Sequence, residues 1–310
     1  MKIILSGCAG FIGSNILREL IKKHDVIGID NLLTGHIENI EDVRDEFEFV
    51  LGDLTDIDTC NKVCKGADMI CHQAALPSVP RSISDPIKSN FNNVTATVNL
   101  LKAAVDNDVK RIVMASSSSV YGNQPTLPKI ETMIPAPVSP YAVSKLTGEY
   151  YLKSFCNMYG IDGVSLRYYN VFGPRQDQNS AYAAVIPKFI TAALSGNPIT
   201  VYGDGSQSRD FTFIDNVINA NIRALKSEKN LNGEVINIAC GKSYTILDLI
   251  DVIEKVSGKT LNVIFDKDRA GDVKHSLADI SKAEQLLGYV PIVGFEEGIK
   301  TAYNYYRRAI

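Results

Sequence analysis

Two residues with complementary proton chemistry lie one helical turn apart in the segment SPYAVSKLTGEYY, residues 139–151. Ser139 and Pro140 are typical of an N-cap and a first helical residue, so Tyr141 and Lys145 should share one helix face. A free tyrosine, with a pKa of about 10, is a poor base at neutral pH. An ammonium group held close to it favours the phenolate and lowers that pKa. The pair could therefore transfer protons, although a core tyrosine beside a solvated lysine would give the same pattern.

The N-terminal segment predicts a dinucleotide site. The apolar run KIILS is followed by GCAGFIG, by a helical pattern and by a second apolar run, DVIGID, which ends at Asp30. In this order Gly7 permits a tight turn, Gly10 lets the backbone approach a pyrophosphate, and Gly13 allows close helix packing. Asp30 is placed to accept hydrogen bonds from ribose hydroxyls. Because its charge would repel a 2′-phosphate, the sequence favours NAD over NADP.

Strands and helices then alternate through the first half of the chain. Helices are predicted over 56–65 and 85–107, and apolar, β-branched runs between them predict strands. This alternation indicates an α/β fold with a doubly wound parallel sheet. Ligands of such sheets bind beyond the carboxyl ends of the strands. The residues expected at those ends are Gly7, Asp30, Asp53, Ala74, Ser117 and Asn170.

After Asn170 the chain becomes more polar, and glycine and proline mark many turns. Helices are predicted in AVIPKFITAALSG and FIDNVINANIRAL, and strands in GEVINIA and LNVIF. We expect a dinucleotide-binding domain of residues 1–169 plus about 213–240. A smaller substrate lobe would comprise residues 170–212 and 241–310.

Composition excludes several classes of protein. The 310 residues are 45% hydrophobic and 22% charged, and the net charge of −3 gives no reason to expect nucleic acid. No apolar run is long enough to predict a membrane span, and the first run is too short for a secretory signal. The six cysteines are scattered, which favours free thiols and a reduced, cytoplasmic setting. The four histidines do not cluster with them, so no metal site is predicted.

The order and spacing of the motifs, over essentially the whole chain, resemble the extended short-chain dehydrogenase/reductase family. More narrowly, the chain is similar to nucleotide-sugar 4-epimerases that act on UDP-glucose or UDP-N-acetylglucosamine. The motifs are GCAGFIG, GDL at 52–54, HQAA at 72–75, SSSSVYG at 116–122, YAVSK at 141–145 and YYNVFGPRQ at 168–176. The resemblance implies a Rossmann-type sheet with a substrate lobe at the C-terminal end.

The resemblance also implies a mechanism. Tyr141 takes the proton from the sugar 4-hydroxyl while the hydride of C4 passes to NAD, and Ser117 hydrogen-bonds the same oxygen. Lys145 binds the nicotinamide ribose and holds down the pKa of Tyr141. The 4-keto sugar turns over and receives the hydride on its other face, so NAD is regenerated. Four consecutive serines leave the choice of Ser117 open, and His72 is expected to be structural.

The same resemblance implies two sets of binding residues. The residues for NAD are Gly7, Gly10, Phe11, Ile12, Gly13, Asp30, Asn31, Asp53, Leu54, Ala74, Ala75 and Asn93, with Tyr141 and Lys145. The residues for the UDP-sugar are Ser117, Asn170, Ala184, Val201, Tyr202, Arg209, Arg269, Asp272 and Ser276. Arg209 and Arg269 suit the diphosphate because a planar guanidinium pairs with phosphate oxygens, although either could form a surface salt bridge instead.

Within the family, small polar residues at particular positions indicate which reaction the chain catalyses. Dehydratases carry an Asp-Glu pair before VYG and decarboxylases a Glu, whereas Ser118 and Ser119 stand there in this chain, which favours epimerisation. UDP-glucose epimerases commonly have a bulky aromatic residue where this chain has Ser276, so a 2-acetamido group would fit. One departure is Pro77, where close relatives tend to have glycine.

The predicted reaction is therefore the interconversion of UDP-GlcNAc and UDP-GalNAc. Epimerisation of UDP-glucose/UDP-galactose or of a UDP-N-acetylhexosaminuronate remains an alternative. A nonenzymatic NAD-sensing protein on the same fold is a remote one, because such proteins usually lose Tyr or Lys from the pair. The resemblance further implies a homodimer built on a four-helix bundle. The apolar positions expected there are Val98, Leu101, Val105, Leu146, Tyr150 and Phe155.

Overall fold

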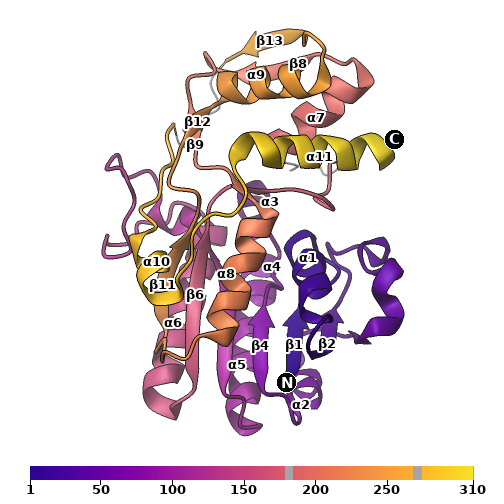
Figure 1. Cartoon of the computed structure of the whole chain (residues 1–310). Helices are drawn as coiled ribbons and strands as arrows, with labels where there is room; N and C mark the ends of the chain where they lie inside the picture. Colours follow the sequence, from indigo (N-terminus) through magenta and orange to yellow (C-terminus); the bar gives the residue numbers. More distant parts are fainter. Residues whose placement is uncertain (179–183, 268–273, 310) are drawn as a thin grey trace.

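A seven-stranded parallel sheet forms the centre of the protein (Figure 1). The computed structural model describes residues 1–178, 184–267 and 274–309. The strand order is β11-β6-β5-β4-β1-β2-β3, so the chain reverses direction across the sheet between β1 and β4. The strands are β1 Lys2–Ser6, β2 Asp25–Asp30, β3 Glu48–Leu51, β4 Met69–His72, β5 Arg111–Ser117, β6 Asp162–Tyr168 and β11 Glu234–Ile238. The predicted fold class is confirmed.

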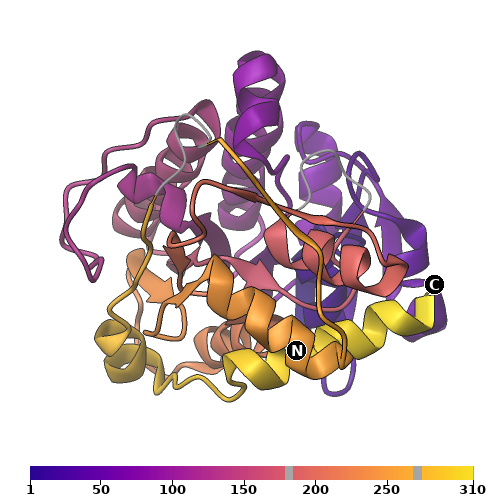
Figure 2. The same ribbon diagram turned by 90° about the horizontal axis from the view of Figure 1, so that it is seen from above.

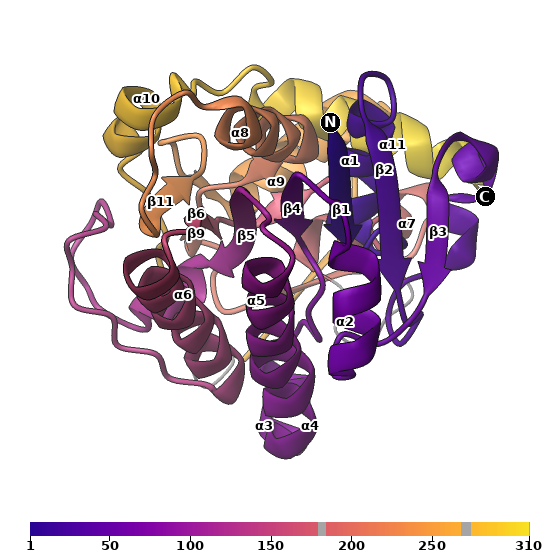
Figure 3. The same cartoon turned by 90° about the horizontal axis from the view of Figure 1, so that it is seen from below.

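Helices cover both faces of the sheet, which is why its strands read as nearly continuous apolar runs (Figure 3). On one face α1 (Phe11–Leu20) and α8 (Ile214–Lys226) pack on Ile3 and Leu5 of β1. Ile4 points to the other face, toward α2 (Ile57–Cys64), α5 (Ala96–Asp106) and α6 (Pro140–Tyr159). Successive strand residues thus serve two separate cores.

The helix predicted over 85–107 is present but is not uniform. It begins as α4 (Pro86–Asn90), passes through one π-helical turn, η3 (Phe91–Thr95), and continues as α5. The Asp85 side chain caps it by accepting a hydrogen bond from the Lys88 amide at 2.9 Å. A short helix that we did not predict, α3 (Val79–Ser84), precedes it. The 3₁₀ turns of this half of the chain are η1 Ile37–Asn39, η2 Glu41–Glu46 and η4 Ser118–Tyr121.

A smaller lobe lies over the carboxyl ends of the strands (Figures 1 and 2). Its helices are α7 Val185–Ser195, α9 Ile246–Ser257 and α11 Phe295–Ala309, whereas α10 (Ser281–Leu287) packs on β11 of the large sheet. Three strand pairs connect its segments: β8 Ile199–Tyr202 with β13 Val263–Asp266, β9 Ser208–Arg209 with β12 Tyr244–Thr245, and β7 Val171–Phe172 with β10 Thr212–Phe213. Of the longer pair, only β13 was predicted.

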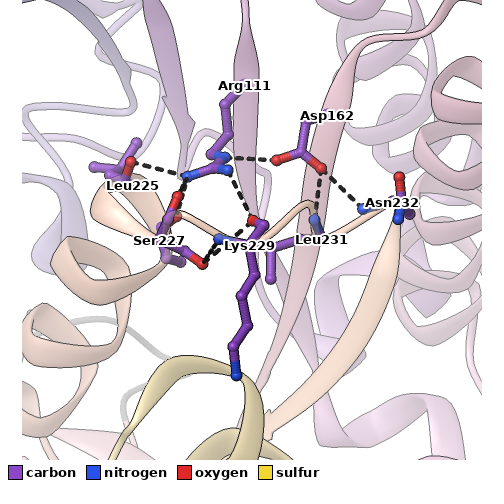
Figure 4. Close-up of polar contacts among 8 residues, drawn as sticks. Arg111, Asp162, Leu225, Ser227, Lys229, Leu231 and Asn232 are labelled. Atoms are coloured by element: carbon purple, nitrogen blue, oxygen red, sulfur yellow. Dashed lines mark hydrogen bonds and ion pairs between the residues drawn. The ribbon is translucent and has the colours of Figure 1, made fainter.

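An ion-pair cluster closes the amino edge of the sheet (Figure 4). Arg111 and Asp162 are register partners at the first residues of β5 and β6, and Nε of Arg111 lies 2.6 Å from Oδ2 of Asp162. The guanidinium also donates to carbonyls of the last turn of α8 and of the segment that follows it, namely those of Ala224, Leu225, Ser227 and Lys229. The other carboxylate oxygen accepts from the amides of Leu231 and Asn232 at 2.7 and 2.8 Å. The cluster fixes the connection that returns the chain to β11.

Two of the apolar positions expected at a dimer bundle were assigned to the wrong face. Leu101 and Phe155 are buried in the core that α5 and α6 share with the sheet, because each points back to the strands. Tyr150 is exposed, and the remaining three are half-buried. The exposed apolar side chains on α4, η3 and α6 are Ile87, Phe91, Val143, Tyr150, Tyr151, Met158 and Tyr159.

The six cysteines are all free thiols. Burial raises the pKa of Cys60, Cys64 and Cys71 to about 12, so these thiols resist ionisation and behave as small apolar residues. Across residues 1–178, 184–267 and 274–309, no helix has the length and apolar character needed to cross a membrane.

Candidate active site

A cavity of about 400 Å³ opens at the carboxyl edge of the sheet, where the strand order reverses. The glycine turn after β1, the ends of β2, β4 and β5, and the first turns of α6 line it. It brings together all the predicted cofactor residues except Asn93. The lining residues among them are Gly7, Gly10, Phe11, Ile12, Gly13, Asp30, Asn31, Asp53, Leu54, Ala74, Ala75, Tyr141 and Lys145.

The glycine turn has the shape that a pyrophosphate needs. Gly7 has a φ of +71°, and a Cβ there would lie 2.8 Å from the backbone of Ala74. A Cβ on Gly13 would lie 1.9 Å from the Gly7 carbonyl oxygen. Gly10 is the N-cap of α1 and carries no side chain, so the first N–H groups of the helix can meet an anion. These residues therefore fit NAD.

Two carboxylates, those of Asp30 and Asp53, line the same cavity. Asp30 accepts hydrogen bonds from the amides of Ala9 and Leu32, both at 2.9 Å, and burial raises the pKa of its carboxyl group. The carboxylate is thereby fixed against the glycine turn. Asp53 accepts from the side-chain amide of Asn31 at 2.9 Å. Both acids lie where a ribose or a base with hydroxyl or amino groups could donate to them.

Tyr141 stands at the start of α6, as predicted. The Ser139 hydroxyl caps the helix by accepting from the Ala142 amide at 3.2 Å, and the Tyr141 amide donates to the Ser82 hydroxyl at 3.0 Å. Burial raises the pKa of Tyr141, and its hydrogen bond with Ser117 acts in the opposite direction. We predicted that Lys145 would lower the pKa of Tyr141, and this lowering is not seen. The reason is geometric, because the ammonium group of Lys145 donates to the Ala115 carbonyl at 3.0 Å.

Behind Tyr141 and Lys145 lies a buried ion pair between Glu149 and Arg167, which the sequence analysis missed. Glu149 accepts from Ser116 Oγ at 2.5 Å and from Arg167 Nε and Nη2 at 2.8 and 2.7 Å. The guanidinium carbon of Arg167 lies 4.7 Å from the centre of the Tyr121 ring. Burial lowers the pKa of Lys145 to about 8, and the charge of Glu149 opposes that shift. Glu149 is four residues after Lys145, a spacing that could have revealed it.

Asn93 and His72 support the site from behind. Asn93 is buried and does not line the cavity: it accepts from the Leu76 amide at 2.7 Å and donates to the Ser144 hydroxyl at 3.0 Å. It therefore ties the loop after β4 to α6. His72 contacts the hydroxyls of Ser6 at 2.7 Å and Thr97 at 3.0 Å. Burial lowers its pKa to about 3, so it is neutral and has the structural role we expected.

A second cavity, of about 580 Å³, lies within the smaller lobe and is lined by residues of α7 and β8. Ala184 lines both cavities, so the two meet at that residue. The second cavity brings together the predicted substrate residues Asn170, Ala184, Val201, Tyr202 and Arg209.

The other predicted substrate residues lie elsewhere. Ser276 is half-buried, and its amide donates to the Ser208 carbonyl at 3.0 Å. Ser276 is not among the described residues that line either cavity. Ser117 reaches the site through its contact with Tyr141. Arg269 and Asp272 lie outside the described residues.

Several lining residues were not predicted. Pro77, the departure from the family pattern, lines the first cavity together with Arg81 and Tyr168. The Tyr168 hydroxyl lies 3.2 Å from Gln73 Oε1 and 3.1 Å from Asn221 Oδ1, which fixes it at the end of β6. Tyr168 belongs to the YYNVFGPRQ motif quoted above, but nothing in its spacing distinguished a lining residue from a buried one.

Residues 3–239 match the NAD dependent epimerase/dehydratase family. The chain therefore belongs to this family of enzymes, whose cofactor is NAD, and both expectations are confirmed. The narrower resemblance is confirmed as well, since similar proteins are named as 4-epimerases of UDP-sugars.

Three of these proteins illustrate the range of substrates. A UDP-N-acetylglucosamine 4-epimerase from Methanobrevibacter ruminantium, solved with UDP-N-acetylmuramic acid, is 43% identical with a TM-score of 0.95, and the match covers 100% of this chain and 99% of that one. A UDP-glucuronic acid 4-epimerase from Bacillus cereus, solved with UDP-glucuronic acid and NAD, is 36% identical with a TM-score of 0.93 and full coverage of both chains. A UDP-glucose 4-epimerase from Mycolicibacterium smegmatis is 36% identical over 312 residues, 99% of each chain.

Proposed function

We propose that the protein catalyses the NAD-dependent C4 epimerisation of a UDP-N-acetylhexosamine, converting UDP-GlcNAc to UDP-GalNAc. The observation that carries the proposal is the meeting of two cavities at Ala184. One cavity holds Tyr141 and Lys145 beside the glycine turn, and the other holds Asn170 and Arg209. A sugar that extends from a diphosphate at Arg209 toward Tyr141 would cross that junction.

The residues of the chain supply the proton chemistry. Tyr141 takes the proton of the 4-hydroxyl, and Ser117 holds the same oxygen by a hydrogen bond. Lys145, one helical turn away, lines the same cavity and would hold the nicotinamide ribose. When bound, NAD accepts the hydride of C4 and returns it to the opposite face of the ring. Tyr141 then gives the proton back to the epimeric oxygen.

Two observations support an acetylated substrate. The residue at the junction of the cavities is an alanine, which leaves room for a 2-acetamido group, and Ser276 is small where UDP-glucose epimerases commonly have a bulky aromatic residue. The relative at 43% identity is named as a UDP-N-acetylglucosamine 4-epimerase. The runner-up is UDP-glucose 4-epimerisation, which the name of the Mycolicibacterium relative favours. Epimerisation of a UDP-uronic acid is a third possibility, in line with the Bacillus relative.

We further propose that two different parts of the chain bind NAD and the UDP-sugar. Residues 1–169 with about 213–240 would hold NAD, and residues 170–212 with 241–310 would hold the UDP-sugar. Arg209 is the described residue best suited to the diphosphate, because it lines the second cavity and a guanidinium can pair with phosphate oxygens. Asn170 and Tyr202 line the same cavity and would meet the nucleoside.

One experiment tests the substrate directly. The purified protein is incubated separately with UDP-GlcNAc, UDP-glucose and UDP-glucuronic acid, without added cofactor, and the C4 epimers are resolved by chromatography. We expect UDP-GalNAc as the fastest product and NAD released on denaturation of the protein. Faster conversion of UDP-glucose would make UDP-glucose the preferred substrate in place of UDP-GlcNAc. Bound NAD without any turnover would favour the NAD-sensing alternative.

We also propose a homodimer. The exposed apolar side chains Ile87, Phe91, Val143 and Tyr150 lie on α4, η3 and α6, which pack side by side. Two copies of this surface would form a four-helix bundle and remove these side chains from water. Light scattering at micromolar concentration should give twice the mass of the 33.9 kDa chain. The mass of a single chain would overturn this proposal.

A further inference from the structure

Three successive residues at the end of β5 are each held by a different side chain of α6. The three side chains lie at intervals of four residues, so they form one stripe along the helix. The contacts pair Lys145 with the Ala115 carbonyl, Glu149 with the Ser116 hydroxyl, and Tyr141 with the Ser117 hydroxyl. Because these three contacts run along one strand end, a shift of α6 along β5 would break them together.

Glu149 is the innermost residue of this stripe. Its side chain is 2% exposed and that of its partner Arg167 is 3% exposed, so both charges are removed from water. Arg167 is the register partner of Ser116 in the β5–β6 ladder. The carboxylate of Glu149 therefore joins α6, β5 and β6 at one point, immediately behind Lys145.

We propose that Glu149 is a positioning residue of the reaction, which fixes the register of α6 against β5 and supplies a buried negative charge behind Lys145. This inference rests on the roles proposed above for Tyr141 and Lys145. Glu149 itself lies behind the cavity and does not line it. Its effect must therefore pass through Lys145 and Ser116.

The charged and titratable groups around Lys145 come from four elements. Tyr141 and Glu149 lie on α6, His72 on β4, Arg167 and Tyr168 on β6, and Tyr121 on η4. His72 is neutral because of its lowered pKa, and burial raises the pKa of both Tyr121 and Tyr168, so these three carry no charge near pH 7. Glu149 is therefore the negative group that favours the ammonium form of Lys145.

The test compares Glu149→Gln with a matched variant at the other end of the same strand pair, Asp162→Asn. Both remove one carboxylate from a buried pair with arginine, and both keep an amide of the same size. We measure kcat for the UDP-sugar from pH 6 to 9. In Glu149→Gln the alkaline limb should move toward neutrality by about one pH unit, because Lys145 loses the negative charge that favours its ammonium form. In Asp162→Asn it should not move.

A double variant covers the risk that Glu149→Gln fails to fold. In Glu149→Gln/Arg167→Met both charges are absent, and buried ion pairs tolerate such apolar replacement. Its alkaline limb should be displaced as in Glu149→Gln, because Lys145 lacks the charge of Glu149 in both variants. An alkaline limb at the wild-type position in both variants, or one displaced by the same amount in Asp162→Asn, would overturn the proposal.

A second readout needs no activity. The free energy of unfolding is measured from pH 7 to 10 for each protein and for its Lys145→Met counterpart, and the difference isolates Lys145. Because the folded pKa is about 8 and the unfolded one 10.5, this difference should rise with pH between those values. In Glu149→Gln the rise should begin about one pH unit lower. If the wild type epimerises none of the UDP-sugars, the proposed function fails, and this readout still decides the role of Glu149.

Discussion

Two buried arginine–carboxylate pairs lie at opposite ends of the same two strands. Arg111 pairs with Asp162 at the amino ends of β5 and β6, and Arg167 pairs with Glu149 at the carboxyl ends. Both are hydrogen-bonded at distances of 2.6–2.8 Å. By chemistry alone the two pairs would be judged equivalent, although the side chains at the carboxyl edge are 3% and 2% exposed and those at the amino edge 11% and 10%.

Their remaining hydrogen bonds separate them. At the amino edge the spare donors and acceptors go to main-chain groups after α8, so the pair only closes the fold (Figure 4). At the carboxyl edge the spare acceptor goes to Ser116, which lies between Ala115 and Ser117 and thus between the contacts of Lys145 and Tyr141. The role of a buried ion pair is therefore determined by what its free atoms contact. Removing either pair should lower the free energy of unfolding, but only removal of the pair at the carboxyl edge should affect the reaction.

The largest effect is expected at the carboxyl edge, from Tyr141→Phe. Phenylalanine keeps the ring and its packing but removes the group proposed to accept the 4-hydroxyl proton. Epimerisation should fall by at least about 100- to 10,000-fold, the usual contribution of a general base. Binding of the UDP-sugar, measured by calorimetry, should be nearly unchanged, because the site proposed for the diphosphate is at Arg209 in the other cavity. A variant that kept a tenth of the wild-type rate would assign the base to another residue.

At the amino edge, Asp162→Asn should change stability and nothing else. Removing one partner of a buried pair leaves the other charge uncompensated, which typically costs about 3–5 kcal/mol. The free energy of unfolding from urea titration should fall by that amount. The turnover number per folded molecule should stay at the wild-type value, since no atom of this cluster contacts the cavity. A lowered turnover number would mean that the two edges are coupled.

A smaller effect is expected from Ser117→Ala. Its hydroxyl shares the proton path with Tyr141, and loss of one such hydrogen bond costs about 1 kcal/mol or somewhat more, close to a tenfold fall in kcat. Ser118→Ala is the control from the same serine run. The kcat of this second variant should match that of the wild type. Equal losses in both variants would show that the run acts through its backbone conformation.

The mildest test is the pH profile of the wild type. Burial lowers the pKa of Lys145 from 10.5 to about 8 in the folded protein. The ammonium group is therefore lost as the pH rises through 8, and with it the charged donor proposed to hold the nicotinamide ribose. Activity should decline above that pH, as measured by kcat between pH 6 and 9. A profile flat to pH 9 would mean that Lys145 stays protonated there.

Much of the fold could be predicted because its signals are local. The glycine turn, the apolar runs and the cap formed by Ser139 each depend on neighbouring residues, and they placed Gly7, Asp30 and Tyr141 correctly. The same kind of signal predicted the seven strands of the large sheet. Two-residue strands and the pairing of β8 with β13 were not predictable, since such short segments carry no period.

The errors in the site came from contacts between distant residues. Asn93 resembled a cofactor ligand by motif, yet its side chain is occupied by Leu76 and Ser144, which only the folded chain brings near. Leu101 and Phe155 read as surplus apolar positions, but burial between helix and sheet accounts for both. The direction of the Tyr141 pKa depended on whether Lys145 faced the phenol or the Ala115 carbonyl, and sequence spacing does not decide between these.

The central claim is that C4 is inverted by removal and return of the same hydride, with Tyr141 moving only the hydroxyl proton. It is tested most directly with UDP-GlcNAc deuterated at C4, incubated with the protein in ordinary water and analysed by mass spectrometry and NMR. We predict UDP-GalNAc that retains deuterium at C4, formed without net oxidation or reduction of the sugar. Loss of the label to solvent would contradict the claim, because it would mean that the carbon-bound hydrogen leaves as a proton.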